Sequence, residues 1–170
     1  MTLPILVAGG GIGGLATALA LSRAGLPVTV LEQAAAFGDV GAGIQLGPNA
    51  VRLLDGWGLG PALRAVAATP QQLQVRDAHS GHTLGTLRLG AAMRQRYGHD
   101  YLSAHRADLH KLLLDAARQA GAAVVSGFTI KNIAEEPYSV LASGINHAKK
   151  AENVEGQALI GCDGLWSVVR

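Results

Sequence analysis

Three glycines near the amino terminus have the spacing that lets a backbone bind a diphosphate. Gly9, Gly11 and Gly14 form a G-x-G-x-x-G pattern directly after the apolar run Leu3 to Ala8. The first glycine permits a tight turn, the second leaves room for a pyrophosphate, and the third lets the next helix lie close to the sheet. We expect that helix at residues 12–24, with its N-terminal N–H groups directed at the phosphates.

An acidic residue at the end of the second expected strand extends this pattern. Val28 to Leu31 is an apolar β-type segment, and Glu32 follows it. A carboxylate at this position accepts hydrogen bonds from the adenosine ribose hydroxyls and repels a 2′-phosphate. A glycine-rich turn without a ligand is the alternative, which the strand–turn–helix–strand context disfavours. The sequence therefore predicts a site for an ADP-containing dinucleotide.

The composition limits the classes of protein to which the chain can belong. It has 170 residues, 49% hydrophobic and 15% charged, which is typical of a globular protein with one core. A net charge of +2 without a block of like charges argues against nucleic acid and membranes as partners. The single cysteine excludes an internal disulfide and favours the cytoplasm. We expect neither a targeting segment nor a membrane-spanning helix.

The rest of the chain alternates between strand and helix patterns. We expect helices from Pro48 towards Trp57, over 91–97 and over 107–119, a β-hairpin of residues 72–77 and 83–89, and further strands over 122–126, 129–134 and 157–162. The pattern weakens over residues 135–155, where we predict an irregular hairpin with a mobile tip. Gly41 and Gly43 either let the backbone approach a ligand or belong to a surface turn.

The histidines do not form a convincing catalytic or metal site. His79 and His82 lie three residues apart in the expected hairpin turn, without further ligands that complete a metal site. His99, His105 and His110 have solvated or capping roles as the simpler explanation. We therefore assign no metal ligand and no catalytic residue.

Arg106 stands just before the expected helix over residues 107–119. A positive side chain at a helix N-terminus gains nothing from the helix dipole, so another interaction must account for it. Contact with a phosphate or a flavin is one explanation, and an ion pair with a nearby acid is the other.

Four segments of the chain carry a family resemblance. They are GGGIGG at 9–14 with Glu32, AFGDVGAGI at 36–44 with GPNA at 47–50, HRADL at 105–109, and CDGLWSVVR at 162–170. Together they resemble the amino-terminal part of the flavoprotein hydroxylase family, the FAD-dependent aromatic-ring monooxygenases. Within that family the salicylate hydroxylase and 3-hydroxybenzoate 6-hydroxylase branch is the most similar.

The resemblance implies a fold and a set of cofactor-binding residues. The fold is α/β, a Rossmann-like FAD-binding domain over residues 1–170 with a glutathione-reductase-type βαβ start and an inserted β-hairpin region. The residues implied to bind FAD are Gly9, Gly11, Gly13, Gly14, Glu32, Arg106, Asp163 and Gly164. Cys162 replaces a residue that is often alanine in the family, so we interpret it as a small buried side chain.

The resemblance also implies an activity, the hydroxylation of a small aromatic acid of the salicylate or 3-hydroxybenzoate type with NAD(P)H and O2. The family's substrate domain and second FAD motif match no part of these residues. We therefore expect a truncated chain that is inactive alone and self-associates through exposed strand edges. An FAD-binding fragment without catalysis, or a different FAD-dependent oxidoreductase of the same fold, are the alternatives.

Overall fold

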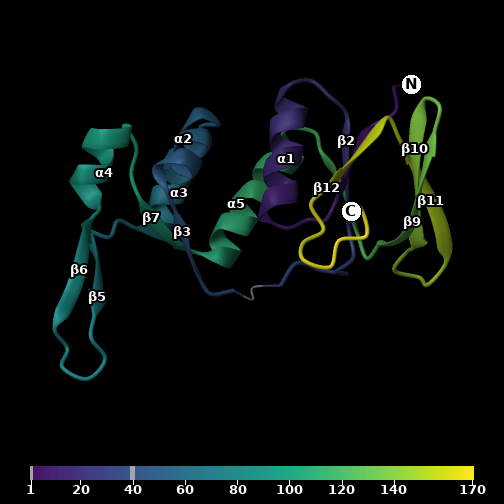
Figure 1. The fold of residues 1–170 in the computed structure, drawn as a ribbon. Coiled ribbons are helices and arrows are strands. Elements are labelled where there is room, and N and C mark those ends of the chain that lie inside the picture. Colours follow the sequence, from purple (N-terminus) through teal and green to yellow (C-terminus); the bar gives the residue numbers. More distant parts are fainter. Residues whose placement is uncertain (1, 39–40) are drawn as a thin grey trace. The chain divides into compact units, whose positions relative to one another are not determined.

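The computed structural model describes residues 2–38 and 41–170 and divides into two compact units (Figure 1). The first unit comprises Met1–Asp39 and Leu113–Arg170, and the second comprises Val40–Leu112. Asp39 and Val40, which belong to one of the four segments of the resemblance, lie outside the described residues. Each unit is described by itself below.

A four-stranded parallel sheet forms the centre of the first unit. Its strands lie in the order β12, β1, β2, β8. Their bounds are Ala158–Gly161, Ile5–Ala8, Val28–Glu32 and Ala123–Ser126. Leu6 and Val7 of β1 are completely buried, as expected for an inner strand of a parallel sheet. The α/β fold class and the four strands predicted from the sequence are thus confirmed.

Helix α1 (Ile12–Arg23) covers one face of this sheet (Figure 1). It buries Leu15, Ala18 and Leu19, and it ends before Gly25, whose φ of +81° is the left-handed conformation that favours glycine. The predicted helix over residues 12–24 is confirmed.

An antiparallel sheet packs on the other face of the parallel sheet. Its strands lie in the order β11, β10, β9, with the bounds Ala151–Gly156, Ser139–Ile145 and Thr129–Glu136. Leu6 and Leu31 of the parallel sheet form one buried cluster with Phe128, Val140 and Ala142. Burial of these apolar side chains holds the two sheets together.

The hairpin predicted over residues 135–155 is present as the pair of β10 and β11, but the prediction that it is irregular was wrong. Strand β10 buries every second residue, Val140, Ala142 and Gly144, and pairs with both neighbours, with one register shift at Gly144. Two of these three buried residues are small, so the period of two was hidden in the sequence. At the tip, the Asn146 Oδ1 accepts hydrogen bonds from the N–H groups of Ala148 (3.0 Å) and Lys150 (3.1 Å), which defines the turn.

The second unit contains short strands and helices. The strands β3 (Gly43–Leu46), β7 (Leu102–His105) and β4 (Ala67–Ala68) form an antiparallel sheet in that order. The helices are α2 (Pro48–Gly56), α3 (Gly60–Val66) and α4 (Gly90–Tyr97), and α5 (Arg106–Gln119) continues from this unit into the first. Helices α2, α4 and α5 confirm the predictions, whereas α3 and the three strands were not predicted.

The hairpin of β5 (Gln72–Arg76) and β6 (Thr83–Arg88) confirms another prediction (Figure 1). All eleven residues of the two strands are exposed. Among them are the apolar side chains of Leu73, Val75 and Leu84, the last of which is 70% exposed.

A network of ion pairs joins the helices of the second unit. Arg64 binds both carboxylate oxygens of Asp55, at 2.7 and 3.0 Å, and its Nε donates to Asp100 at 3.2 Å. Arg94 Nη2 lies 2.6 Å from the other oxygen of Asp100, and His99 Nδ1 lies 3.0 Å from Asp55. Hydrogen bonds from Arg64 lower the pKa of Asp55 to about 2; burial opposes the shift and His99 adds to it.

We expect the Asp55 carboxylate to stabilise the second unit at neutral pH and to lose this effect in acid. Its pKa lies below the ordinary 3.8, so the contribution is complete above about pH 4 and disappears as the pH falls towards about 2. Asp55→Asn should lower the free energy of unfolding by about 1 kcal/mol at neutral pH, allowing for the solvent around Arg64.

Urea unfolding at neutral pH and at about pH 2 measures the free energy of unfolding of the unchanged chain and of Asp55→Asn. Glu136→Gln, which replaces an exposed carboxylate at the end of β9, is the control. An equal cost of Asp55→Asn at both pH values would contradict the prediction.

Candidate functional site

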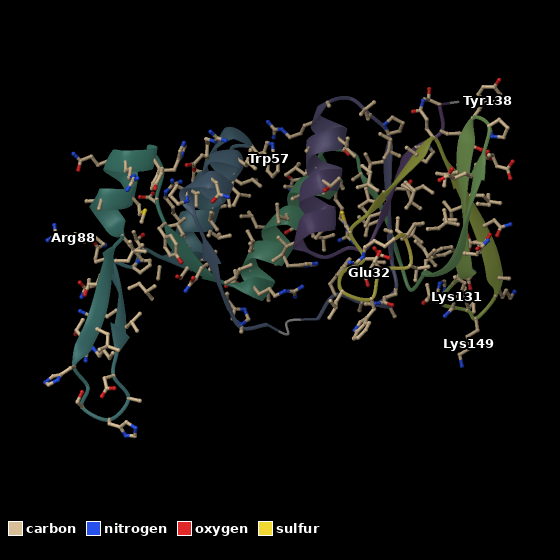
Figure 2. All side chains as sticks on the ribbon, viewed as in Figure 1. Glu32, Trp57, Arg88, Lys131, Tyr138 and Lys149 are labelled. Atoms are coloured by element: carbon tan, nitrogen blue, oxygen red, sulfur yellow. The ribbon has the colours of Figure 1, made fainter. Side chains whose placement is uncertain are left out.

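The carboxyl edge of the parallel sheet brings three of the predicted site segments together. The glycine loop follows β1, Glu32 ends β2, and Asp163 follows β12. Because neighbouring strands run parallel, these ends lie at one edge of the sheet, where Figure 2 labels Glu32. The Gly9 N–H donates to the Leu31 carbonyl at 2.8 Å, which continues the β1–β2 pairing into the loop.

The glycines of the loop have two different reasons to be glycine. Gly9 has a φ of +98°, and a Cβ on it would lie 2.5 Å from the carbonyl oxygen of Cys162. A Cβ on Gly14 would overlap the carbonyl oxygen of Gly9. By contrast, a Cβ on Gly11 or Gly13 would meet no described atom within 4 Å. The fold therefore requires glycine at positions 9 and 14, whereas Gly11 and Gly13 border open space.

The amino terminus of α1 opens onto this space. Its N-cap residue is Gly11, and among the described residues no side chain caps the helix and no acid lies in its first turn. The first N–H groups of a helix have no partners within the helix, and the helix dipole makes this end positive. The open loop and the uncapped helix end fit a diphosphate group.

Backbone donors hold the carboxylate of Glu32 in one orientation. Its Oε2 accepts a hydrogen bond from the Gly10 N–H at 2.6 Å, and its Oε1 accepts one from the Ala34 N–H at 2.7 Å. A carboxylate has about four acceptor positions, so two remain for other donors such as ribose hydroxyls. Gly10, which joins the glycine loop to this carboxylate, was not among the predicted site residues.

Asp163 organises the loop that follows β12. Its carboxylate accepts hydrogen bonds from the Ser167 hydroxyl and the Val168 N–H, both at 2.7 Å, and Gly164 has a φ of +78°. Partial burial raises the pKa of Asp163, but the hydrogen bonds from Ser167 and Val168 outweigh it, so the pKa lies below its usual value. The sequence pointed to a ligand contact here and missed this role within the loop.

Arg106 belongs to the second unit, where it begins α5. Its N–H donates to the Ala42 carbonyl at 3.1 Å, and a Cβ on Gly41 would lie 2.7 Å from the Arg106 Cβ. This contact gives Gly41 a reason within the fold, whereas a Cβ on Gly43 would meet no described atom within 4 Å. The ligand contact of the exposed Arg106 stays a prediction.

Two of the histidines make contacts within the fold, and two others are exposed in a turn. His99 pairs with Asp55, and His105 Nδ1 accepts a long hydrogen bond of 3.4 Å from the Ala107 N–H at the start of α5. His79 and His82 are exposed in the turn between β5 and β6. Within the described ranges, no group of three or more metal-ligating side chains is placed to hold a metal ion.

Comparison with known proteins identifies what this arrangement resembles. Residues 2–170 match the family described as "FAD binding domain". The chain is 44% identical over 169 residues to "3-hydroxybenzoate 6-hydroxylase" of Polaromonas naphthalenivorans, and the match covers 99% of this chain and 41% of that protein. The chain thus spans about two fifths of the length of this curated relative.

Solved structures share the fold. One is p-nitrophenol 4-monooxygenase PnpA from Pseudomonas putida, with a TM-score of 0.90 at 22% identity, covering 99% of this chain and 42% of that chain. Another is a variant of HpxO from Klebsiella pneumoniae complexed with FAD, with a TM-score of 0.79 at 26% identity, covering 97% and 40% of the two chains.

In the described part of our chain, no helix is long and apolar enough to cross a membrane.

Substitution should distinguish the loop glycines that border open space from those that the fold requires. Gly11→Ala places a methyl group in open space, so we expect the free energy of unfolding to change by no more than about 0.5 kcal/mol. The same methyl group occupies the space beside the helix end, so FAD affinity should fall at least about tenfold. Thermal melting and FAD titration measure the two effects.

Gly14→Ala is the matched variant, because it adds the same methyl group against the Gly9 carbonyl. We expect it to destabilise the fold by about 1 to 3 kcal/mol, as overpacking does. If both variants lost the same stability, or if Gly11→Ala bound FAD normally, the distinction between the two pairs of glycines would be wrong.

Proposed function

The chain belongs to the FAD binding domain family, and we propose that it is the FAD-binding part of a flavin-dependent monooxygenase that hydroxylates an aromatic hydroxy acid. The observation that carries the proposal is the carboxylate of Glu32, fixed by Gly10 beside an open glycine loop and an uncapped helix end. An acid and an anion site at this spacing suit the adenosine ribose and the diphosphate of FAD.

The binding roles follow from the geometry of each residue. Gly11 and Gly13 leave space for the diphosphate, Gly9 and Gly14 shape the loop, and Glu32 accepts from the ribose hydroxyls. Asp163, Gly164 and Arg106 are proposed to contact the part of FAD between the diphosphate and the flavin. Bound FAD would supply the hydride acceptance and oxygen activation that amino-acid side chains lack.

The substrate and the reductant belong to the same proposal. The 44% identity to a protein named 3-hydroxybenzoate 6-hydroxylase supports a small aromatic acid of the 3-hydroxybenzoate or salicylate type. NAD(P)H as the electron donor is proposed from the family resemblance alone. The low cysteine content supports a cytoplasmic location, and the net charge of +2 supports the absence of nucleic-acid or membrane partners.

Exposed apolar side chains support self-association as a further part of the proposal. Leu73, Val75, Leu84 and Leu87 of the β5–β6 hairpin are 48–70% exposed, and the hairpin forms a sheet of only two strands. Apolar side chains and open strand edges of this kind favour pairing between chains.

An FAD titration of the purified chain, followed by quenching of flavin fluorescence, tests the proposal. We expect saturable binding that weakens at least about a hundredfold in the Glu32→Ala, Gly11→Val double variant, which removes one charge-assisted contact and fills the phosphate space. Tyr138→Ala, at a side chain that is 93% exposed in the β9–β10 turn, is the control and should bind as the unchanged chain does.

The titration also has outcomes that reject the proposal. Absence of saturable FAD binding to a folded chain would do so, as would equal affinities of the unchanged chain and the double variant. NADH oxidation that a hydroxybenzoate stimulates would show that these 170 residues also catalyse, whereas we expect FAD binding without turnover because none of them has an assigned catalytic role.

A further inference from the structure

One aromatic side chain lies against Gly10, the residue whose N–H donates a hydrogen bond to Glu32. The segment 33–38 between β2 and β3 is exposed at every residue except Phe37, which is half-buried. A Cβ on Gly10 would lie 2.9 and 3.0 Å from the Phe37 ring atoms Cε1 and Cζ, and 3.1 Å from the Glu32 Cβ. The outer edge of the ring therefore rests on the Gly10 Cα, beside the stem of Glu32.

This contact explains why position 10 is glycine. Gly10 is buried, and any larger residue would displace either the Phe37 ring or the Glu32 side chain. The Gly10 N–H donates the shorter of the two backbone hydrogen bonds to the carboxylate, at 2.6 Å. The ring, Gly10 and Glu32 thus form one packed group within the first unit.

We propose that Phe37 is a positioning residue that fixes the Glu32 carboxylate and makes the site selective for an adenosine ribose with a free 2′-hydroxyl. The inference rests on the proposed FAD site and goes beyond it, because no motif or comparison assigned a role to this side chain.

Two physical effects of the ring support the proposal. An apolar ring packed against Gly10 limits the access of water to this donor residue, which strengthens the hydrogen bond between Gly10 and Glu32. It also lowers the local dielectric and the screening by ions, so a 2′-phosphate near the fixed carboxylate is repelled more strongly. Without the ring, the carboxylate can turn towards solvent, and both the affinity and the discrimination decrease.

The experiment measures binding of three ligands to the 170-residue chain by titration calorimetry: FAD, ADP-ribose and 2′-phospho-ADP-ribose. For Phe37→Ala we expect FAD and ADP-ribose affinities about five- to tenfold lower, the effect of one weakened hydrogen bond to a charged group. The preference for ADP-ribose over its 2′-phosphate should narrow by at least about threefold. Phe37→Leu keeps an apolar side chain against Gly10, so it should retain most of the affinity and most of the preference for ADP-ribose.

A double-mutant cycle separates positioning from a merely structural role. In a Glu32→Gln background, Phe37→Ala should cost less than about twofold in ADP-ribose affinity, because the charge that the ring positions is gone. Tyr138→Ala is the control for loss of an aromatic ring in the same unit. Circular dichroism and melting curves identify variants that fail to fold, and for these Phe37→Leu provides the comparison.

The results can reject either the role of Phe37 alone or the proposed function as a whole. An unchanged ligand preference in folded Phe37→Ala, or costs of Phe37→Ala that are equal with and without the Glu32 charge, would overturn the role of Phe37 while FAD binding stands. Failure of the unchanged, folded chain to bind either FAD or ADP-ribose would instead reject the proposed function, and this inference with it.

Discussion

The pairing of β1 with a strand on each side is the constraint on which the site depends. Two backbone hydrogen bonds extend this pairing past the strand ends, from Gly9 to Leu31 and from Cys162 to Ala8, both at 2.8 Å. They place the glycine loop, the acid that ends β2 and the loop after β12 at one edge of the sheet. The buried apolar cluster between the two sheets, around Leu6 and Phe128, stabilises the parallel sheet. Without the pairing of β1 with β2 and β12, the three segments would not lie at one edge of a sheet.

Much of the first unit could be predicted from the sequence because its signals are local and strong. The apolar run before Gly9, the helix that ends at Gly25 and the acid at position 32 each carry a physical requirement in a few residues. The antiparallel sheet was harder, since β10 places small residues such as Ala142 and Gly144 where larger apolar side chains would have shown the period. Long-range pairing then supplied the regularity that the local pattern lacked.

In the proposed site, the sequence indicated candidate binding positions but not the contacts that support them. Gly11 and Glu32 could be found from motif chemistry, whereas the packing of Phe37 on Gly10 depends on a segment without helix or strand. In the second unit, β4 has two residues and α3 has seven, which is too short for either period to be visible. The network of Asp55, Arg64 and Asp100 is invisible in the sequence for a different reason, because Arg64 joins two carboxylates that are far apart along the chain.

The position of β12 has a consequence for the order in which the chain can fold. Residue 5 pairs with residue 158, so β1 acquires one of its two neighbours only once β12 has been synthesised. Contacts so distant in sequence form slowly, because a long loop must close before they contribute any stability. A nascent chain would therefore carry β1 with one edge open until β12 has been made. Among the described strands, the first therefore completes its pairing only after all the others have been made.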